Sequence, residues 1–133
     1  MNDNELVGII RGGIFEVFKQ LGPGLLESVY QDALMAELIA RGLKPEKQVE
    51  VPILYKGKEV SAPLRIDILV NKRIIVELKA VEGGLKLVHY RQIQTYLRLS
   101  NRHRGILVNF NTSFIGSDDI ETVLNSHCTR KNS

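Results

Sequence analysis

The sequence predicts an α/β domain in which helices flank a mixed central β-sheet. Residues 5–20 and 86–99 repeat apolar side chains at intervals of three and four, which is typical of helices. Residues 64–80 and 105–110 instead form short apolar runs of strand length. The order helix, helix, three strands, helix, strand favours helices packed on a sheet.

Two helices are predicted at the start of the chain. The first spans residues 5–20, although Gly12-Gly13 weakens it, since glycine costs about 1 kcal/mol against alanine inside a helix. Gly22-Pro23-Gly24 ends this helix and begins a second, which Gly42 stops. The apolar stripe of the second helix consists of Leu26, Val29, Tyr30, Ala33, Leu34 and Leu38.

The strands follow in the middle of the chain. Residues 49–55 alternate with period two, and Lys56-Gly57-Lys58 predicts a turn. Strands near 64–70 and 74–80 are apolar on both faces, as central strands covered by helices are. The polar break Asn71-Lys72-Arg73 makes them a hairpin. After residue 111 the chain is polar, with a short helix expected over 118–124.

Length and composition indicate one globular domain. The 133 residues, 44% hydrophobic and 25% charged, fit a single unit over 1–133, with a core at about 5–110 and a polar tail at 111–133. A net charge of +3 is a weak hint of nucleic-acid binding. The single cysteine, Cys128, argues against a disulfide framework or a cysteine zinc site and fits a reducing cytoplasm. Neither a signal peptide nor a membrane span of ~18 apolar residues is indicated.

Three charged residues interrupt the apolar hairpin strands. Asp67, Glu77 and Lys79 lie where burial of an unpaired charge is costly. Glu77 and Lys79 are two apart on a strand and share a face, and Asp67 can lie opposite Glu77. Paired carboxylates suit Mg²⁺ or Mn²⁺, and a lysine beside them could orient or deprotonate a water. The alternative is a structural ion pair of Lys79 with Glu77 or Asp67.

The register of the predicted hairpin decides whether Asp67 and Glu77 can share one site. A two-residue turn would pair Asp67 with Val76 and place Asp67 and Glu77 on opposite faces. A three-residue turn, or a bulge, would pair Asp67 with Glu77. We therefore predict an odd-length turn or a bulge, with Asp67, Glu77 and Lys79 on one face beneath Glu27. The opposite face should pack against a helix layer through Ile66, Ile68, Val76 and Leu78.

Three motifs resemble those of a known family. Asp67, followed after nine residues by Glu77-Leu78-Lys79, resembles the D…(D/E)xK signature of the PD-(D/E)XK nuclease superfamily, with Ile66 in place of the proline. The stretch 24–30 resembles the motif of the GxxExxY protein family, a branch of that superfamily. The stretch 92–96 resembles the QxxxY motif of its RecB-like and lambda-exonuclease-like members. The resemblance covers about residues 5–110 and implies a restriction-endonuclease-like core.

The resemblance also implies an activity and a set of site residues. It implies a Mg²⁺- or Mn²⁺-dependent nuclease that hydrolyses phosphodiester bonds of DNA. Asp67, Glu77 and the Leu78 backbone carbonyl would hold the metal, and Glu27 would join them directly or through water. Lys79 would assist the nucleophilic water. The catalytic set is Glu27, Asp67, Glu77, Lys79, Gln92 and Tyr96, the last two positioning Lys79 or the phosphate.

Several residues of this set also fit simpler roles at the sequence level. Glu27 could serve only the helix dipole, Tyr96 could be core, and Gln92 could be an exposed helix residue. His89 shares the stripe of Gln92 and Tyr96 and is expected to be a substrate contact or a surface residue. Expected contacts to nucleic-acid phosphates are Lys86, His89, Arg91, Arg98, Arg102 and Arg104.

A second function class is also open. The chain could be a non-catalytic nucleic-acid-binding or protein-interaction module that retains the nuclease fold. Nucleic acid, most simply DNA, is the expected partner, no membrane partner is expected, and a homo-oligomer is possible.

Overall fold

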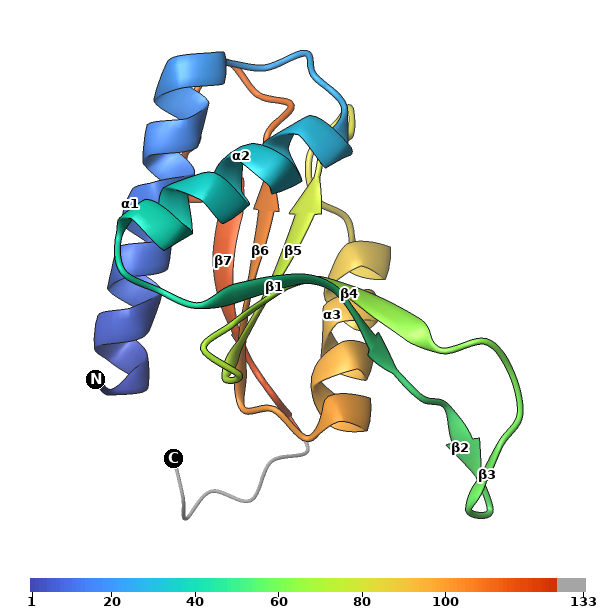
Figure 1. The fold of residues 1–133 in the computed structure, drawn as a ribbon. Helices are drawn as coiled ribbons and strands as arrows, with labels where there is room; N and C mark the ends of the chain where they lie inside the picture. Colours follow the sequence, from blue (N-terminus) through green and yellow to red (C-terminus); the bar gives the residue numbers. More distant parts are fainter. Residues whose placement is uncertain (127–133) are drawn as a thin grey trace.

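The computed structural model describes residues 1–126 and shows a five-stranded mixed sheet between two helical layers (Figure 1). The strand order is β1-β4-β5-β6-β7, with only β5 and β6 parallel. The elements are α1 (Asp3–Leu21), α2 (Glu27–Ala40), β1 (Pro45–Val51), β2 (Leu54–Tyr55), β3 (Lys58–Glu59), β4 (Leu64–Val70), β5 (Ile74–Lys79), α3 (Leu87–Ser100), β6 (Arg104–Asn109) and β7 (Ile120–Leu124). Cys128 and the end of the predicted tail lie outside the described residues.

The helices cover opposite faces of the sheet. α1 and α2 pack on one face, where the larger apolar cluster includes Leu6, Leu34 and Val76. α3 packs on the other face, where Ile93 and Leu97 contact a second cluster around Ile75. This arrangement confirms the predicted α/β class and explains why β5 is apolar on both sides. No helix within residues 1–126 combines the length and apolarity needed to cross a membrane.

The first helix tolerates its glycines because one of them lies at a helix contact. A Cβ built on Gly13 would come within 3.0 Å of the Leu38 side chain of α2. A larger residue would therefore push the two helices apart. The N-terminus of α1 is closed by a capping box between Asn2 and Glu5, which satisfies two backbone N–H groups.

Two sequence predictions about the strands need correction. The short helix expected over residues 118–124 is wrong, because this segment is β7, antiparallel to β6 at the sheet edge. The β-branched side chains of Ile120, Thr122 and Val123 favour a strand, a signal that the polar surroundings obscured. The single strand expected over 49–55 is interrupted at Pro52, which separates β1 from the short β2.

The predicted odd-length turn is confirmed. Val70 pairs with Ile74 and Ile68 with Val76, so three residues, Asn71-Lys72-Arg73, connect β4 to β5. Asn71 and Lys72 have positive φ of 54° and 60°, and the Arg73 N–H donates to the Val70 carbonyl at 2.9 Å. This register places Asp67 level with Glu77.

One face assignment in the hairpin is wrong. Ile68, Val76 and Leu78 pack on the α1 and α2 side as predicted, but Ile66 packs on the α3 side. The change occurs around Asp67, where Gln48 of the neighbouring β1 has a positive φ of 53° and is missing from the paired register. Strict alternation along β4 therefore fails at the position that carries the carboxylate.

Candidate active site

The β4–β5 pairing ends where the two carboxylates begin. The last registered pair is Ile68 with Val76. Beyond it, the Leu78 N–H donates to Asp67 Oδ2 and the Asp67 N–H donates to Glu77 Oε2, each at 2.9 Å. Each carboxylate thus binds a main-chain N–H at the point where the hairpin ladder stops. The local backbone holds both acids together.

Burial makes this pair of acids unusually hard to ionise together. Glu77 is only 2% exposed, and its burial together with the nearby Asp67 charge raises its pKa to about 8. Burial also raises the pKa of Asp67, against the opposing effects of the Leu78 N–H and Lys79. Desolvation is the largest cause of both raised pKa values. A bound cation would relieve both desolvation and repulsion.

Lys79 is held by an amide and not by an acid. Its Nζ donates to Gln92 Oε1 at 2.6 Å, and Gln92 Nε2 lies 3.3 Å from the Tyr96 hydroxyl. The ion pairs found within residues 1–126 do not include Lys79, so the structural ion pair considered from sequence is not formed. The charge of Lys79 lowers the pKa of both Asp67 and Glu77, so its ammonium is within electrostatic range of both acids.

The glutamate of α2 reaches the end of β5 from the opposite helical layer. Glu27 Oε2 accepts a hydrogen bond from the Ala80 N–H at 3.2 Å, directly after β5. Its charge also raises the pKa of Asp67, which places it within electrostatic range of the acid pair. Glu27 therefore does more than stabilise its own helix.

Tyr30 explains the spacing of the motif around Glu27. Its ring is fully buried and stacks on Phe110 with a centroid distance of 4.3 Å. Its hydroxyl donates to the Gly22 carbonyl at 2.6 Å, while the Leu25 N–H donates to the same hydroxyl at 3.2 Å. One side chain thus closes the loop that leads into α2 and sets the position of Glu27.

We expect Tyr30→Phe to destabilise the protein by about 1–2 kcal/mol, because it removes an acceptor and a donor from two part-buried backbone groups. The melting temperature should fall by roughly 3–8 °C. Tyr90→Phe, which removes the hydroxyl of a tyrosine that is only half-buried, is the control. Equal melting temperatures for the two variants, measured by calorimetry, would argue against the loop clamp.

His89 lies at the same end of α3 as Gln92. Its Nδ1 accepts a hydrogen bond from the Lys86 N–H at 2.9 Å, which places the proton of the neutral imidazole on Nε2. Burial and the charges of Lys79 and Lys86 lower its pKa, while Glu27 opposes them. His89 is therefore near the acidic site and carries a neutral N–H donor.

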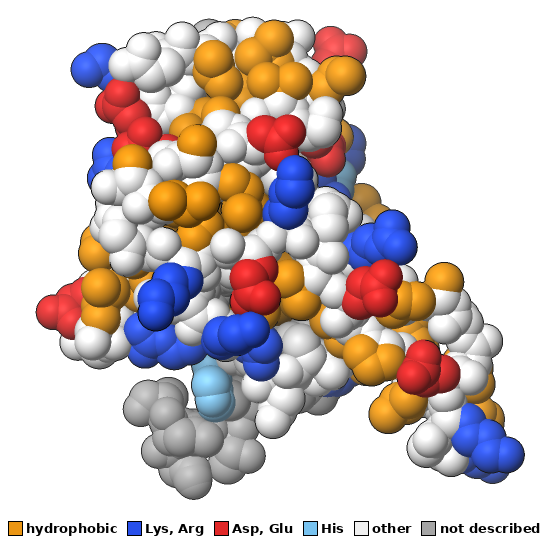
Figure 2. All heavy atoms as spheres, in the orientation of Figure 1, with side chains coloured by type: hydrophobic (Ala, Val, Ile, Leu, Met, Phe, Trp, Pro, Cys, Tyr) orange, Lys and Arg blue, Asp and Glu red, His pale blue; other side chains and the backbone are white. Residues whose placement is uncertain are grey.

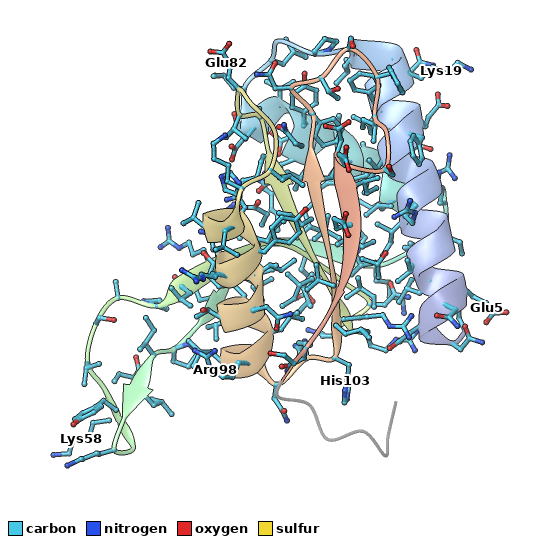
Figure 3. All side chains as sticks on the ribbon, turned by 180° about the vertical axis from the view of Figure 1, so that it is seen from behind. Glu5, Lys19, Lys58, Glu82, Arg98 and His103 are labelled. Carbon is cyan, nitrogen blue, oxygen red and sulfur yellow. The ribbon has the colours of Figure 1, made fainter. Side chains whose placement is uncertain are left out.

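The basic residues expected to contact nucleic-acid phosphates are divided along the molecule. Lys86 caps the start of α3, whereas Arg98 is in its last turn. Figure 3 places Glu82, just beyond β5, at one end of the molecule and Arg98 and His103 towards the other. Arg104 is the register partner of Ile74, at the end of β5 away from Lys79, and it hydrogen-bonds Asn4 of α1.

Sequence reasoning missed Asn109. It is fully buried and pairs with Lys79 in the β5–β6 register. Its amide donates to the Val81 carbonyl at 3.1 Å and its carbonyl accepts the Val81 N–H at 3.0 Å. Asn109 therefore fixes the segment that follows Lys79. The one polar residue in the apolar run 105–110 was the signal that could have found it.

The donor set fits a hard cation that retains water. Within residues 1–126, no group of three or more acids, histidines or cysteines is gathered closely enough to hold a metal by itself. Two adjacent carboxylates of raised pKa, Asp67 and Glu77, are nevertheless the kind of donors that Mg²⁺ uses when water and substrate phosphates complete its shell. Glu27 accepts the Ala80 N–H through Oε2, and its other carboxylate oxygen could join that shell directly or through water.

Comparisons with known proteins agree with this geometry. The sequence pattern of the PD-(D/E)XK nuclease superfamily matches residues 4–123. Among solved structures, the crystal structure of SSO0001 is similar with a TM-score of 0.52 and 27% sequence identity. The similarity covers 79% of this chain and 52% of the SSO0001 chain, so this chain spans about half the length of that protein. A comparison with curated proteins finds no match.

Proposed function

Because this chain belongs to the PD-(D/E)XK nuclease superfamily, we propose that it is a metal-dependent nuclease that hydrolyses phosphodiester bonds of DNA in the cytoplasm. Its mixed sheet flanked by helices is consistent with the restriction-endonuclease-like fold. The match is to the superfamily, and membership of its GxxExxY branch is part of the proposal. The arrangement of Asp67, Glu77 and Lys79 at the end of β5 carries the functional proposal.

The proposed metal is Mg²⁺ or Mn²⁺, held by Asp67, Glu77 and the Leu78 carbonyl, with Glu27 directly or through water. When bound, such an ion supplies a Lewis acid for the phosphoryl group and its water. The protein supplies the remaining groups. Lys79 presents an ammonium that no acid within residues 1–126 holds in an ion pair, and it can orient the water or stabilise developing charge. Gln92 and Tyr96 hold that ammonium in place.

The direct test is incubation of the purified protein with linear, circular and single-stranded DNA in Mg²⁺ or Mn²⁺. Cleavage products should appear with the wild type and be absent with Lys79→Ala. The three substrates also separate an endonuclease, which nicks circles, from an exonuclease, which needs ends. If the wild type cleaves none of them with either metal, the nuclease proposal fails.

One observation favours a second candidate, a non-catalytic module that retains the nuclease fold. Glu27 binds the Ala80 N–H, and within residues 1–126 it does not join Asp67 and Glu77 in a three-acid group. A Mg²⁺ titration followed by thermal unfolding distinguishes the two functions. A nuclease site should raise the melting temperature as the metal binds, whereas a module without a metal site should not respond.

Gln92→Leu should lower the single-turnover cleavage rate by about 10- to 100-fold, the range usual for groups that position a catalytic residue. The substitution removes the acceptor that holds Lys79 Nζ. Gln94→Leu is the matched control, because Gln94 is on the same helix but binds the Leu124 carbonyl. Equal rates for wild type and Gln92→Leu would exclude a positioning role for Gln92.

A further inference from the structure

A protruding segment of the molecule has no place in the catalytic site. Residues 52–63, here called the arm, connect β1 to β4 and contain β2 and β3 (Figures 1 and 3). Within residues 1–126, β2 and β3 pair only with each other, through Leu54 with Glu59 and Tyr55 with Lys58. The side chains of the arm are absent from both core clusters. The arm therefore extends from the domain without packing on it.

The arm exposes apolar side chains that a monomer would normally cover. Tyr55 is 62% exposed, and Leu54 and Val60 are each 56% exposed. A two-stranded hairpin without such packing is only marginally stable in water. Exposed apolar groups on a weakly supported element indicate a surface that contacts a partner.

The chemistry of the arm's end favours nucleic acid as that partner. Lys56 and Lys58 flank the turn, and Lys56 Nζ lies 5.6 Å from the centre of the Tyr55 ring. Figure 2 shows basic side chains at the end of the arm. Amines neutralise phosphates, and an exposed aromatic ring can pack on the sugars of the backbone. If the partner were a second copy of this chain, a symmetric contact between the two arms would bring their lysines close together, and these like charges would repel.

The position of the arm connects it to the proposed cleavage site. The arm joins β4 at Leu64, three residues or about 10 Å before Asp67. α3 packs in the same apolar cluster as Val51 and Leu64, the residues that border the arm, and Figure 3 shows Arg98 on the side of that helix from which the arm projects. Residues 83–117, which include all of α3, contain no aspartate or glutamate. The stretch therefore presents no carboxylate of its own to repel a polyanion that runs from the site along α3 towards the arm.

We propose that the arm binds the backbone of a double-stranded nucleic acid beyond the scissile phosphodiester. The tip at Gly57 is ten residues from Asp67 along the chain, which corresponds to at most about 33 Å of extended strand. At about 3.4 Å per base pair, this distance is roughly one turn of duplex. The arm thus sets the length of duplex that the protein engages. This inference depends on the proposed nuclease function, because that function places the scissile bond at Asp67.

The test compares binding with cleavage in the full chain. Affinity for 30-base-pair and 8-base-pair DNA duplexes is measured by fluorescence anisotropy without divalent metal, over a range of salt concentrations. Lys56→Glu/Lys58→Glu and Tyr55→Ala are the arm variants. Lys19→Glu/Lys44→Glu is the control, because it changes the net charge equally on exposed lysines away from the arm. Cleavage, circular dichroism and light scattering are recorded for each protein.

The arm lysine variant should bind the long duplex about 10- to 100-fold more weakly. The slope of log affinity against log salt concentration should fall by the amount that corresponds to up to about two phosphate contacts. Its affinity for the short duplex, which is too short to reach the tip, should stay within about twofold of the wild type. Tyr55→Ala should weaken binding to the long duplex with the salt dependence unchanged. The lysine control should match the wild type on both duplexes.

Unchanged affinity of the arm variants would overturn the inference, while cleavage by the wild type would still support the nuclease function. Equal weakening by the control would also overturn it, because general electrostatics would then suffice. Conversion of a wild-type dimer to a monomer by the arm substitutions would identify a second copy as the partner instead. Loss of long-duplex affinity without cleavage by the wild type would keep the arm as a binding surface and reject the nuclease function.

Discussion

Lys79→Ala, Asp67→Ala and Glu77→Ala should each lower metal-dependent DNA cleavage by about 10³-fold or more, to the level of a control without protein. Each of the two acids accepts a main-chain N–H from the strand of the other, and the Lys79 charge acts on both. Initial rates on radiolabelled DNA at saturating Mg²⁺ measure the effect. The alanine variants must retain the circular dichroism spectrum of the wild type for the comparison to count.

Lys72→Ala is the matched control for the lysine substitution. It removes an exposed ammonium from the turn of the same hairpin, where Lys72 pairs with Glu46. This variant should cleave DNA at the wild-type rate. Residual cleavage above about a tenth of wild type in any of the three site variants would mean that the corresponding residue is not part of the catalytic machinery.

The second large effect concerns stability without metal. The pKa of Glu77 is raised from 4.5 in the unfolded chain to about 8 in the folded protein. The folded state therefore holds a proton that the unfolded state has lost over this pH range. The free energy of unfolding should fall with increasing pH between about 4.5 and 8, by about 1.4 kcal/mol per pH unit for one such group. The raised pKa of Asp67 acts in the same direction.

Glu77→Gln should remove most of this pH dependence. The glutamine carbonyl can still accept the Asp67 N–H, and its amide can donate to the Asp67 carboxylate without carrying a charge. At pH 8 and without metal, the variant should therefore be more stable than the wild type by a few kcal/mol. Urea unfolding at pH 5, 6, 7 and 8 with EDTA measures the difference.

Exposed Glu50→Gln is the control for this experiment, since Glu50 forms only a surface ion pair with Arg65. Its unfolding free energy should follow that of the wild type at every pH. Addition of Mg²⁺ at pH 8 should stabilise the wild type but not Glu77→Gln. Parallel pH curves for the wild type and Glu77→Gln would show that Glu77 is ionised in the folded protein without metal.

Periodicity and local chemistry made most of the fold predictable. The helices α1, α2 and α3 follow stripes of apolar residues that any helical arrangement of these segments would bury on one face. The central strands are apolar on both faces, which requires cover on both sides. Even the turn of the β4–β5 hairpin followed from sequence, because only an odd length places Asp67 opposite Glu77.

The local patterns failed where a segment depends on distant neighbours. β7 is short and flanked by polar residues, and only its pairing with β6 makes it a strand. Ile66 changes face at the point where Gln48, on the adjacent strand, has a positive φ and is missing from the paired register. The alternation of residues 49–55 predicts one strand. It could not show that Pro52 separates β1, which belongs to the sheet, from the arm.

For the site, the sequence by itself determined which groups are present: two carboxylates, a lysine, a glutamate on a helix and a glutamine and tyrosine on another. Their chemistry and spacing follow from residue type and from the strand and helix periods. Only the tertiary structure decided that Lys79 bonds to Gln92, that Glu27 reaches Ala80 and that Asn109 holds the following segment. These contacts join elements that are far apart in the chain, and their partners are selected by packing and burial, which no local pattern encodes.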